Sequence, residues 1–198
     1  MAHQPEFLGA SVHDAARRAA DILAVLLPWP GSRVAPGQEG ARLLEVLRAH
    51  GEPDSTEISE ADLAELRQAA AELRPVFAAG DVAAAANRIN SLLAGRAHPP
   101  RLTDHGGTSG WHLHADSSDD APPGEWFLTS SCLAMAVLLA ERQAPPAGLC
   151  ASPSCGRPFV NVGRGAARRY CSPTCGTRER VAAHRSATRG AGRTGDLL

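Results

Sequence analysis

Apolar residues recur every three to four positions through most of residues 1–144, which is the pattern of amphipathic helices. The first such stretch, residues 13–27, predicts a helix that stops at the proline-rich segment 28–31. A second, shorter helix is expected over residues 39–50, where leucines fall on one face. The beginning of the chain therefore predicts helices that pack against one another to cover their apolar faces.

The next two predicted helices have recognisable starts. Residues 59–62 read Ser-Glu-Ala-Asp, which is a capping-box start for a third helix. Pro75 is expected to kink this helix and Gly80 to end it. Asp81 can cap a fourth helix, which is expected to stop before Gly95. The short turns between these helices favour antiparallel packing.

Between residues 96 and 124 the pattern changes to one that predicts a small β-hairpin. A glycine-rich turn separates residues 101–104 from residues 111–115. Residues 126–143 then form the most apolar predicted helix, in which Cys132 is expected to be a core residue. No apolar run approaches the length needed to cross a bilayer, so we expect no contact with a membrane.

Four of the five cysteines lie near the carboxyl end, spaced C-x4-C, then fifteen residues, then C-x3-C. Two short cysteine pairs of this kind can surround one tetrahedral Zn²⁺ when the segment between them folds back. A site of four thiolates has no open position, so one structural zinc ion is expected. Disulfides, a thiol-based redox sensor and an iron–sulfur cluster are the alternatives. The predicted ligands are Cys150, Cys155, Cys171 and Cys175.

The residues around these cysteines predict a knuckle, a hairpin and a helix. Gly156 allows the backbone to turn sharply beside the metal. Residues 159–162 are expected to form a strand, and residues 167–170 a returning strand after a glycine turn. Ser172 is expected to cap a helix over residues 173–189, with proline at its first position. Together these elements predict a treble-clef-like zinc finger.

The finger carries a family resemblance. Residues 150–185 resemble the CGNR-type zinc finger, which usually follows an ABATE domain in stress-induced bacterial transcription regulators. Residues 175–178 read Cys-Gly-Thr-Arg, so Thr177 stands where that finger has asparagine. The other matching segments are Phe-Val-Asn at 159–161, Arg-Arg-Tyr-Cys at 168–171 and, in the expected ABATE order, residues 62–67, 87–93 and 111–114. The resemblance implies a DNA-binding regulator whose first domain senses a signal or dimerises.

Pattern and resemblance together predict an α+β protein with two parts. Residues 1–144 are expected to form an ABATE-like, mainly helical regulatory or sensing domain with a small β-hairpin. Residues 145–149 are expected to be a linker, residues 150–190 the CGNR-type finger, and residues 191–198 a frayed tail.

Charge is divided unevenly along the chain, although the net charge is only −1. Residues 150–198 contain nine arginines against two acidic residues, a net charge of +7. Residues 1–149 contain eleven arginines against nineteen acidic residues, a net charge of −8. This asymmetry indicates that the finger has a polyanionic partner, and double-stranded DNA is the expected one.

The predicted finger helix arranges its arginines for such a partner. At 100° per residue, Arg178, Arg185 and Arg189 fall on one stripe that fits the DNA major groove, and Arg180 lies on a neighbouring face. Further contacts to the DNA backbone are expected from Arg164, Arg168 and Arg169. A solvated helix face, or a helix that docks an acidic protein partner, is the alternative. The predicted regulator would be cytoplasmic and nucleoid-associated, and a homodimer is expected because one finger reads few bases.

Histidines give the sequence a second group of candidate ligands. His112 and His114 point to the same face of a predicted strand, where they could bind a metal or help to bind a small-molecule effector. His98 and His105 lie nearby in the sequence. A solvent-facing strand edge is the interpretation we favour at this point. Because no nucleophile–base constellation or phosphate-binding glycine loop is present, an enzyme is not expected.

Overall fold

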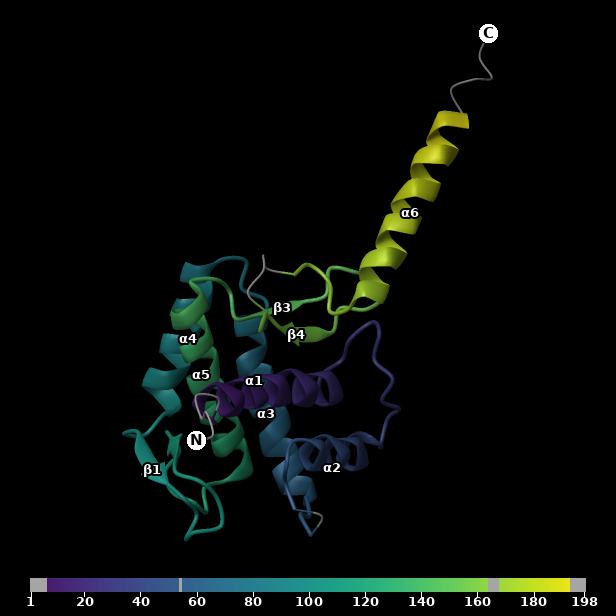
Figure 1. The fold of residues 1–198 in the computed structure, drawn as a ribbon. Helices are drawn as coiled ribbons and strands as arrows, with labels where there is room; N and C mark the ends of the chain where they lie inside the picture. The colour runs from purple at the N-terminus through teal and green to yellow at the C-terminus, as the bar shows by residue number, and fades with distance from the viewer. Residues whose placement is uncertain (1–6, 54, 164–167, 193–198) are drawn as a thin grey trace, which may run out of the picture.

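A computed structural model of the chain describes residues 7–53, 55–163 and 168–192. Within these residues it contains six helices and four short strands, and this confirms the α+β class (Figure 1). The helices are α1 (Phe7–Leu26), α2 (Glu39–Ala49), α3 (Glu60–Phe77), α4 (Val82–Arg96), α5 (Pro123–Arg142) and α6 (Pro173–Gly192), and the strands are β1 (Arg101–Thr103), β2 (His112–His114), β3 (Ala147–Leu149) and β4 (Pro158–Val160).

Helix α5 forms the centre of the helical body. It packs against α1, α3 and α4, and its inward side chains, such as Phe127 and Met135, are completely buried. By length and composition α5 could cross a membrane, but half of its most apolar window is buried inside the protein, as in a core helix. Cys132 is 1% exposed, so its predicted place in the core is confirmed. Burial raises the pKa of its thiol to about 12.

Local signals in the sequence determine where α3 and α4 begin. The Ser59 hydroxyl accepts a hydrogen bond from the Asp62 amide, while the Asp62 carboxylate accepts one from the Ser59 amide, so the predicted capping box is confirmed. Asp81 caps α4 by accepting from the Ala84 amide at 2.7 Å. The carboxyl ends of these two helices were predicted less accurately. Helix α3 stops before Gly80, at Phe77, whereas α4 continues through Gly95 to Arg96.

The predicted β-hairpin is confirmed, with β1 antiparallel to β2 and Thr103 opposite His112. Its outer face carries the exposed Leu102 and Leu113, and its inner face carries the buried Thr103 and His114. The connecting loop turns through positive φ angles at Gly106 (+68°) and Gly107 (+85°), which glycine adopts without strain. His105, just before them, also has a positive φ of 51°.

The strand pairing of the finger differs from our prediction. Strand β4 pairs with β3, so the ribbon encloses the knuckle instead of following it. Of the predicted returning strand, residue 167 lies outside the described residues and residues 168–170 are not a strand. Gly148 explains the observed pairing, because a Cβ there would lie only 2.8 Å from the Phe159 ring. The Arg169 carbonyl instead accepts a hydrogen bond from the Ala151 amide.

The finger ribbon and the helical body share one core. Ala147 of β3 and Val160 of β4 belong to the same buried cluster as the helices. The segment after α1 touches the knuckle directly, since the Gly31 amide donates to the Cys155 carbonyl at 2.9 Å. Residues 147–149, which we expected to belong to a linker, are therefore a packed strand. The division of the chain into separate domains stays a prediction.

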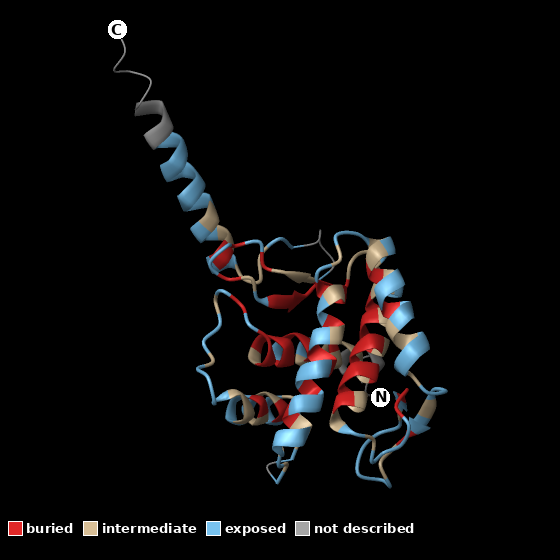
Figure 2. Cartoon of the chain, turned by 180° about the vertical axis from the view of Figure 1, so that it is seen from behind, coloured by how far each residue is buried: buried red, intermediate tan, exposed pale blue. Residues whose placement is uncertain are grey.

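Helix α6 is different from every other helix, because it projects away from the body (Figure 1). All residues from 181 to 188 are exposed, on every face of the helix (Figure 2). The helix extends to Gly192, so residues 191 and 192 of the predicted tail are helical, and the rest of that tail lies outside the described residues.

Candidate zinc centre and nucleic-acid interface

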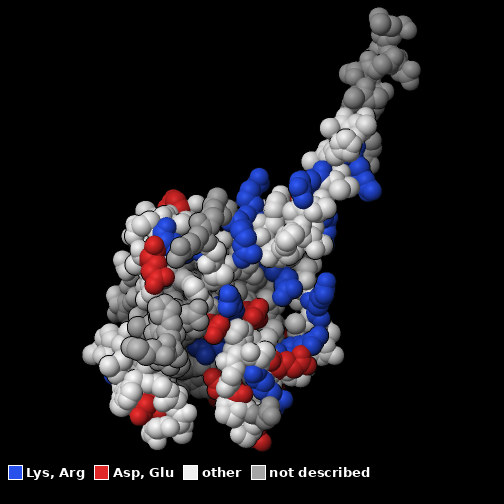
Figure 3. Space-filling view, in the orientation of Figure 1, with Lys and Arg blue, Asp and Glu red and all other residues white. Residues whose placement is uncertain are grey.

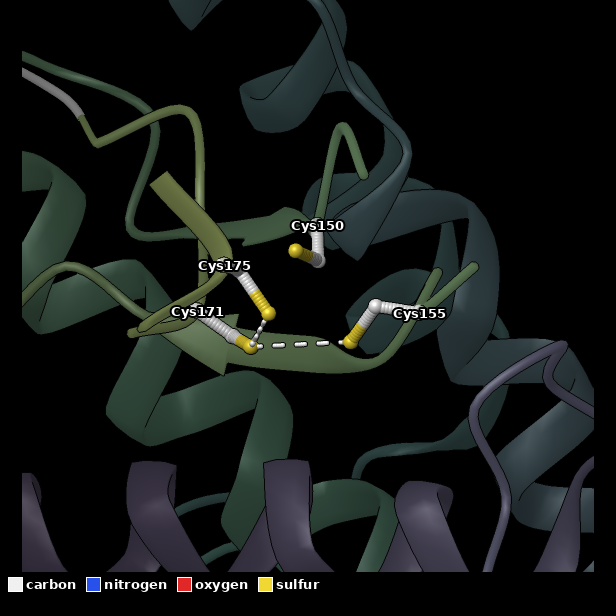
Figure 4. Close-up of side chains that lie close together, drawn as sticks. All are labelled: Cys150, Cys155, Cys171 and Cys175. Carbon is white, nitrogen blue, oxygen red and sulfur yellow. Dashed lines mark hydrogen bonds between the residues drawn. The ribbon is translucent and has the colours of Figure 1, made fainter. Parts of the chain in front are cut away.

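The four finger cysteines form one compact cluster. Their sulfur atoms all lie within 4.8 Å of one another, and they point toward a common centre (Figure 4). The Sγ atom of Cys171 lies 3.7 Å from those of both Cys155 and Cys175. A tetrahedron with Zn–S bonds of about 2.3 Å has sulfur atoms about 3.8 Å apart. The cluster therefore has the dimensions of a structural zinc site.

Two local structures hold these sulfur atoms. In the knuckle, the Ser152 carbonyl accepts from the amides of Cys155 and Gly156, and Gly156 has the positive φ angle (+66°) that the sequence predicted. At the start of α6, the Ser172 hydroxyl accepts from the Cys175 amide at 3.3 Å, which confirms the predicted cap. Each cysteine pair is thus placed by its own short segment.

The environment of the thiols explains why the cluster needs a cation. Burial raises the pKa of Cys155, and burial with the neighbouring thiols raises the pKa of Cys171 to about 12. The Ser172 hydroxyl instead lowers the pKa of Cys175. Zn²⁺ stabilises all four thiolates at once, which no arrangement of protons on the sulfur atoms can do. The five cysteines are free in this structure, with the Cys171 sulfur 3.7 Å from its two neighbours and not at the bonded distance of about 2.05 Å.

Helix α6 is tied to the knuckle beside the cluster. The hydroxyl of Ser152, which is 1% exposed, donates to the Glu179 carboxylate at 2.6 Å. The Arg178 guanidinium donates to the Ser154 hydroxyl at 2.8 Å. Arg178, one of the predicted DNA contacts, therefore also has a structural partner, and the pair fixes the direction in which α6 leaves the body.

The other predicted arginines of the helix are placed differently. Arg185 is exposed and makes no hydrogen bond or ion pair to any described residue. Arg180 is also exposed and donates to the Thr177 hydroxyl at 3.0 Å. The side chain of Arg189 lies outside the described part of the chain. Arg185 is thus the member of the predicted stripe that is most available to a partner.

The predicted arginines of the loop before α6 are partly engaged in the finger. Arg168 donates to the Val160 carbonyl at 2.5 Å and lies 5.1 Å from the centre of the Phe159 ring. Arg169 is exposed and stacks on Tyr170 at 5.8 Å. Arg164 lies outside the described residues. Arg168 therefore stabilises the loop, whereas Arg169 remains open to solvent.

A basic cleft continues the arginine surface onto the body, and the sequence did not reveal it. A cavity of about 880 Å³ lies between the finger and α1. Arginines gather where α6 leaves the body (Figure 3). Those that line the cavity are Arg17, Arg33, Arg157, Arg168 and Arg178. Arg17 and Arg33 lie in the acidic part of the chain, so their position beside the finger could not be inferred without the fold.

The structure also groups histidines in the hairpin. His112 and His114 share the inner face of β2, as predicted, and His105 joins them from the glycine-rich loop. His114 is 8% exposed, so our preferred interpretation of a solvent-facing strand edge is wrong for it. Burial lowers the pKa of His114. His98 stays apart and exposed, 3.7 Å from Glu125.

Comparison with protein families agrees with this arrangement. Residues 147–187 match the CGNR zinc finger, and residues 28–144 match the ABATE family, described as "Putative stress-induced transcription regulator". No curated protein matches the chain. Neither family is a family of enzymes. The four-cysteine cluster therefore holds the structural zinc ion of a CGNR finger, and the chain belongs to the ABATE family.

Proposed function

We propose that this protein is a transcription regulator that binds double-stranded DNA through α6, with the zinc finger as the support of that helix. The observation that carries the proposal is the projection of α6 from the body with residues 181–188 exposed on all faces. A helix that buries no face against its own protein gains little stability from packing. A partner that surrounds the helix, as the major groove of DNA does, explains why it projects.

Charge supports DNA over an apolar partner. The sequence of α6 carries four arginines against Glu179, and Val181 is its only large apolar residue. Guanidinium groups form bidentate hydrogen bonds with guanine or clasp phosphate oxygens. We assign Arg185 and Arg189 to the groove, with Arg178 at the base of the same stripe.

The remaining arginines fit contacts to the DNA backbone. Arg180 and Arg169 are both exposed, and Arg164 is five residues before Arg169 in the sequence. The cleft arginines Arg17 and Arg33 extend this surface beyond the finger. Such contacts fix the position of a protein on DNA without reading its sequence. Arg168 supports the surface by holding its loop to β4.

The zinc ion has a structural part in this proposal. It joins the knuckle to the start of α6, and the pairs Ser152–Glu179 and Arg178–Ser154 align the helix. A regulator of this kind acts in the cytoplasm, on the nucleoid. A homodimer would double the number of bases that one finger reads. A small-molecule effector would bind in the ABATE part of the chain.

The experiment is duplex-DNA binding by the full-length, zinc-loaded protein at two salt concentrations. If about five arginines each neutralise one phosphate, the log–log slope of affinity against salt is about −4 to −5. Arg185→Ala is expected to weaken binding and to retain zinc. Arg88→Ala is the matched control, because Arg88 is equally exposed on α4 of the acidic body. No binding at low salt would refute the proposal and favour an acidic protein partner.

A further inference from the structure

The hairpin contains a second cluster of metal donors, remote from the cysteines in the sequence. The Nε2 atom of His112 lies 3.1 Å from that of His105 and 3.0 Å from that of His114. Zinc bound to three imidazoles at about 2.0–2.1 Å places tetrahedral nitrogen donors about 3.3 Å apart. Three rings on two different segments therefore present the same ring nitrogen to one point, at nearly the spacing of a metal site.

The hydrogen bonds on the other side of the rings determine what these nitrogens can do. The His112 Nδ1 atom lies 2.7 Å from the Gly110 carbonyl oxygen, which only accepts, so Nδ1 carries the proton. The His114 Nδ1 atom lies 2.8 Å from the Asp116 carboxylate, so it carries a proton too. When the rings are neutral, the Nε2 atoms of His112 and His114 are both unprotonated, and their lone pairs face each other. A cation between them removes this repulsion.

The supporting groups resemble those that orient histidines at metal centres, where a carboxylate or carbonyl holds the far ring nitrogen. Asp116 is 1% exposed and is held by Arg101 at 2.7 Å. Asp119 lies 3.6 Å from the His105 Nδ1 atom and is held by Arg101 at 2.5 Å and by Thr103 at 2.8 Å. His112 and His114 thus each have a hydrogen-bond acceptor behind them, Asp119 lies just beyond hydrogen-bond distance behind His105, and Arg101 fixes both carboxylates.

The backbone at His105 indicates that its placement is specific. Its φ of 51° lies in the left-handed region, which residues other than glycine rarely adopt. The two residues that follow are glycines, for which such angles carry no strain, so the loop concentrates the unfavourable conformation on the histidine. Strained residues of this kind are concentrated at functional sites.

The cluster opens into a cavity of about 610 Å³ between the hairpin, α1 and α5. That volume is within the usual range for small-molecule sites. Trp111 and Trp126 line it together with Arg18. The Arg18 guanidinium lies 4.2 Å from the Trp126 ring centre and donates to Ser130, while its buried Nε atom has no hydrogen-bond partner among the described residues. Asp14, Glu52 and Glu141 also line the cavity, so its polar groups are of both signs.

We propose that His105, His112 and His114 bind a divalent transition-metal ion of the zinc class, and that a fourth coordination position faces the cavity and is open to a small lone-pair donor. Three protein donors and an open position distinguish such a site from a closed structural one. Imidazole nitrogens suit zinc, copper, iron and nickel. The proposal concerns the ABATE part of the chain and does not depend on DNA binding.

The first experiment counts metal in the full-length protein after saturation with zinc and dialysis. Wild type is expected to retain two zinc ions per chain, and His112→Ala one. His98→Ala is the matched control and is expected to retain two, because His98 is exposed and lies outside the cluster. One ion per chain in wild type, or two in His112→Ala, would overturn the proposal; the former would mean that the histidines share a proton instead.

Two further measurements keep the proposal testable if His112→Ala does not fold. Asp116→Asn retains a hydrogen-bonding side chain and is expected to weaken zinc binding at the histidines about 10- to 100-fold. Unchanged affinity would contradict the role of Asp116 as a positioning residue. When cobalt replaces zinc, the histidine site is expected to give visible absorption bands without the charge-transfer absorption that thiolate ligands cause. Azide is expected to shift these bands, and absence of a shift would disprove the open position.

Discussion

The two donor clusters of this protein are built in different ways. The four cysteines are placed by two short segments whose spacing is visible in the sequence, and their sulfur atoms close around one point. The three histidines come from a strand and a strained loop, and their positions depend on acceptors such as Asp116 and Asp119. The comparison teaches that local spacing is enough to predict a closed structural site. An open site requires the tertiary structure that orients its ligands.

The largest expected effect tests the closed cluster. Cys171→Ser removes a sulfur atom that lies 3.7 Å from two others, so the finger is expected to lose its zinc ion and unfold. DNA binding should disappear with it, because α6 loses its support. Metal content, circular dichroism and DNA titration check this outcome. The control is Cys132→Ala in the core, which is expected to retain zinc and to lose about 1 kcal/mol of stability. DNA binding that survives Cys171→Ser would mean that α6 does not need the zinc centre in order to bind DNA.

The second prediction compares the cysteines of the finger with the cysteine of the body. Burial raises the pKa of Cys132 from 9.0 to about 12, which leaves about a thousandfold less thiolate at pH 8. The pKa of Cys171 is also about 12 in the folded finger, but removal of zinc is expected to unfold the finger and expose its thiols, whereas Cys132 stays 1% exposed in the core. We therefore expect iodoacetamide to modify the four finger cysteines after zinc is chelated and to leave Cys132 unmodified. Mass spectrometry of the labelled peptides makes the measurement. Early labelling of Cys132 would mean that loss of zinc also unfolds the helical body.

The third prediction concerns the contact between the two regions. A Cβ atom at Gly31 would lie 2.8 Å from the Cys155 Cα, so Gly31→Val is expected to destabilise the protein by about 1–3 kcal/mol. Gly40→Ala is the control, because nothing lies within 4 Å of that Cβ and alanine favours a helix. Thermal unfolding of both variants compares them. Equal stability would mean that the finger does not pack on the segment after α1.

Sequence reasoning succeeded where short-range chemistry determines the structure. The cap at Ser59, the turn at Gly156 and the zinc spacing each depend on residues a few positions apart. It failed where contacts join distant segments. Strand β3 was expected to be linker because it lies in a segment with two prolines and a glycine, and only its pairing with β4, with Gly148 opposite Phe159, shows that it is a strand.

The candidate sites show the same limit. His112 and His114 were visible as a pair because they lie two residues apart in a strand. His105 was grouped with them only by its place in the sequence, since a hairpin loop has to reverse and adopt a positive φ before its ring reaches them. The cleft arginines Arg17 and Arg33 were hidden for a related reason, because more than 100 residues of sequence separate them from the finger residues, such as Arg157 and Arg178, that line the same cavity.

The smallest expected effect is that of Thr177→Asn, which restores the residue typical of CGNR fingers. Thr177 is exposed, and its hydroxyl accepts one hydrogen bond from Arg180, which an asparagine amide oxygen can also accept. We therefore expect the zinc content to be unchanged and the stability to stay within about 0.5 kcal/mol of wild type. An amide can also contact an adenine edge in two places, so the preferred DNA sequence should change while the salt dependence of binding does not. A change of zinc content would instead mean that residue 177 helps to hold the closed four-cysteine site.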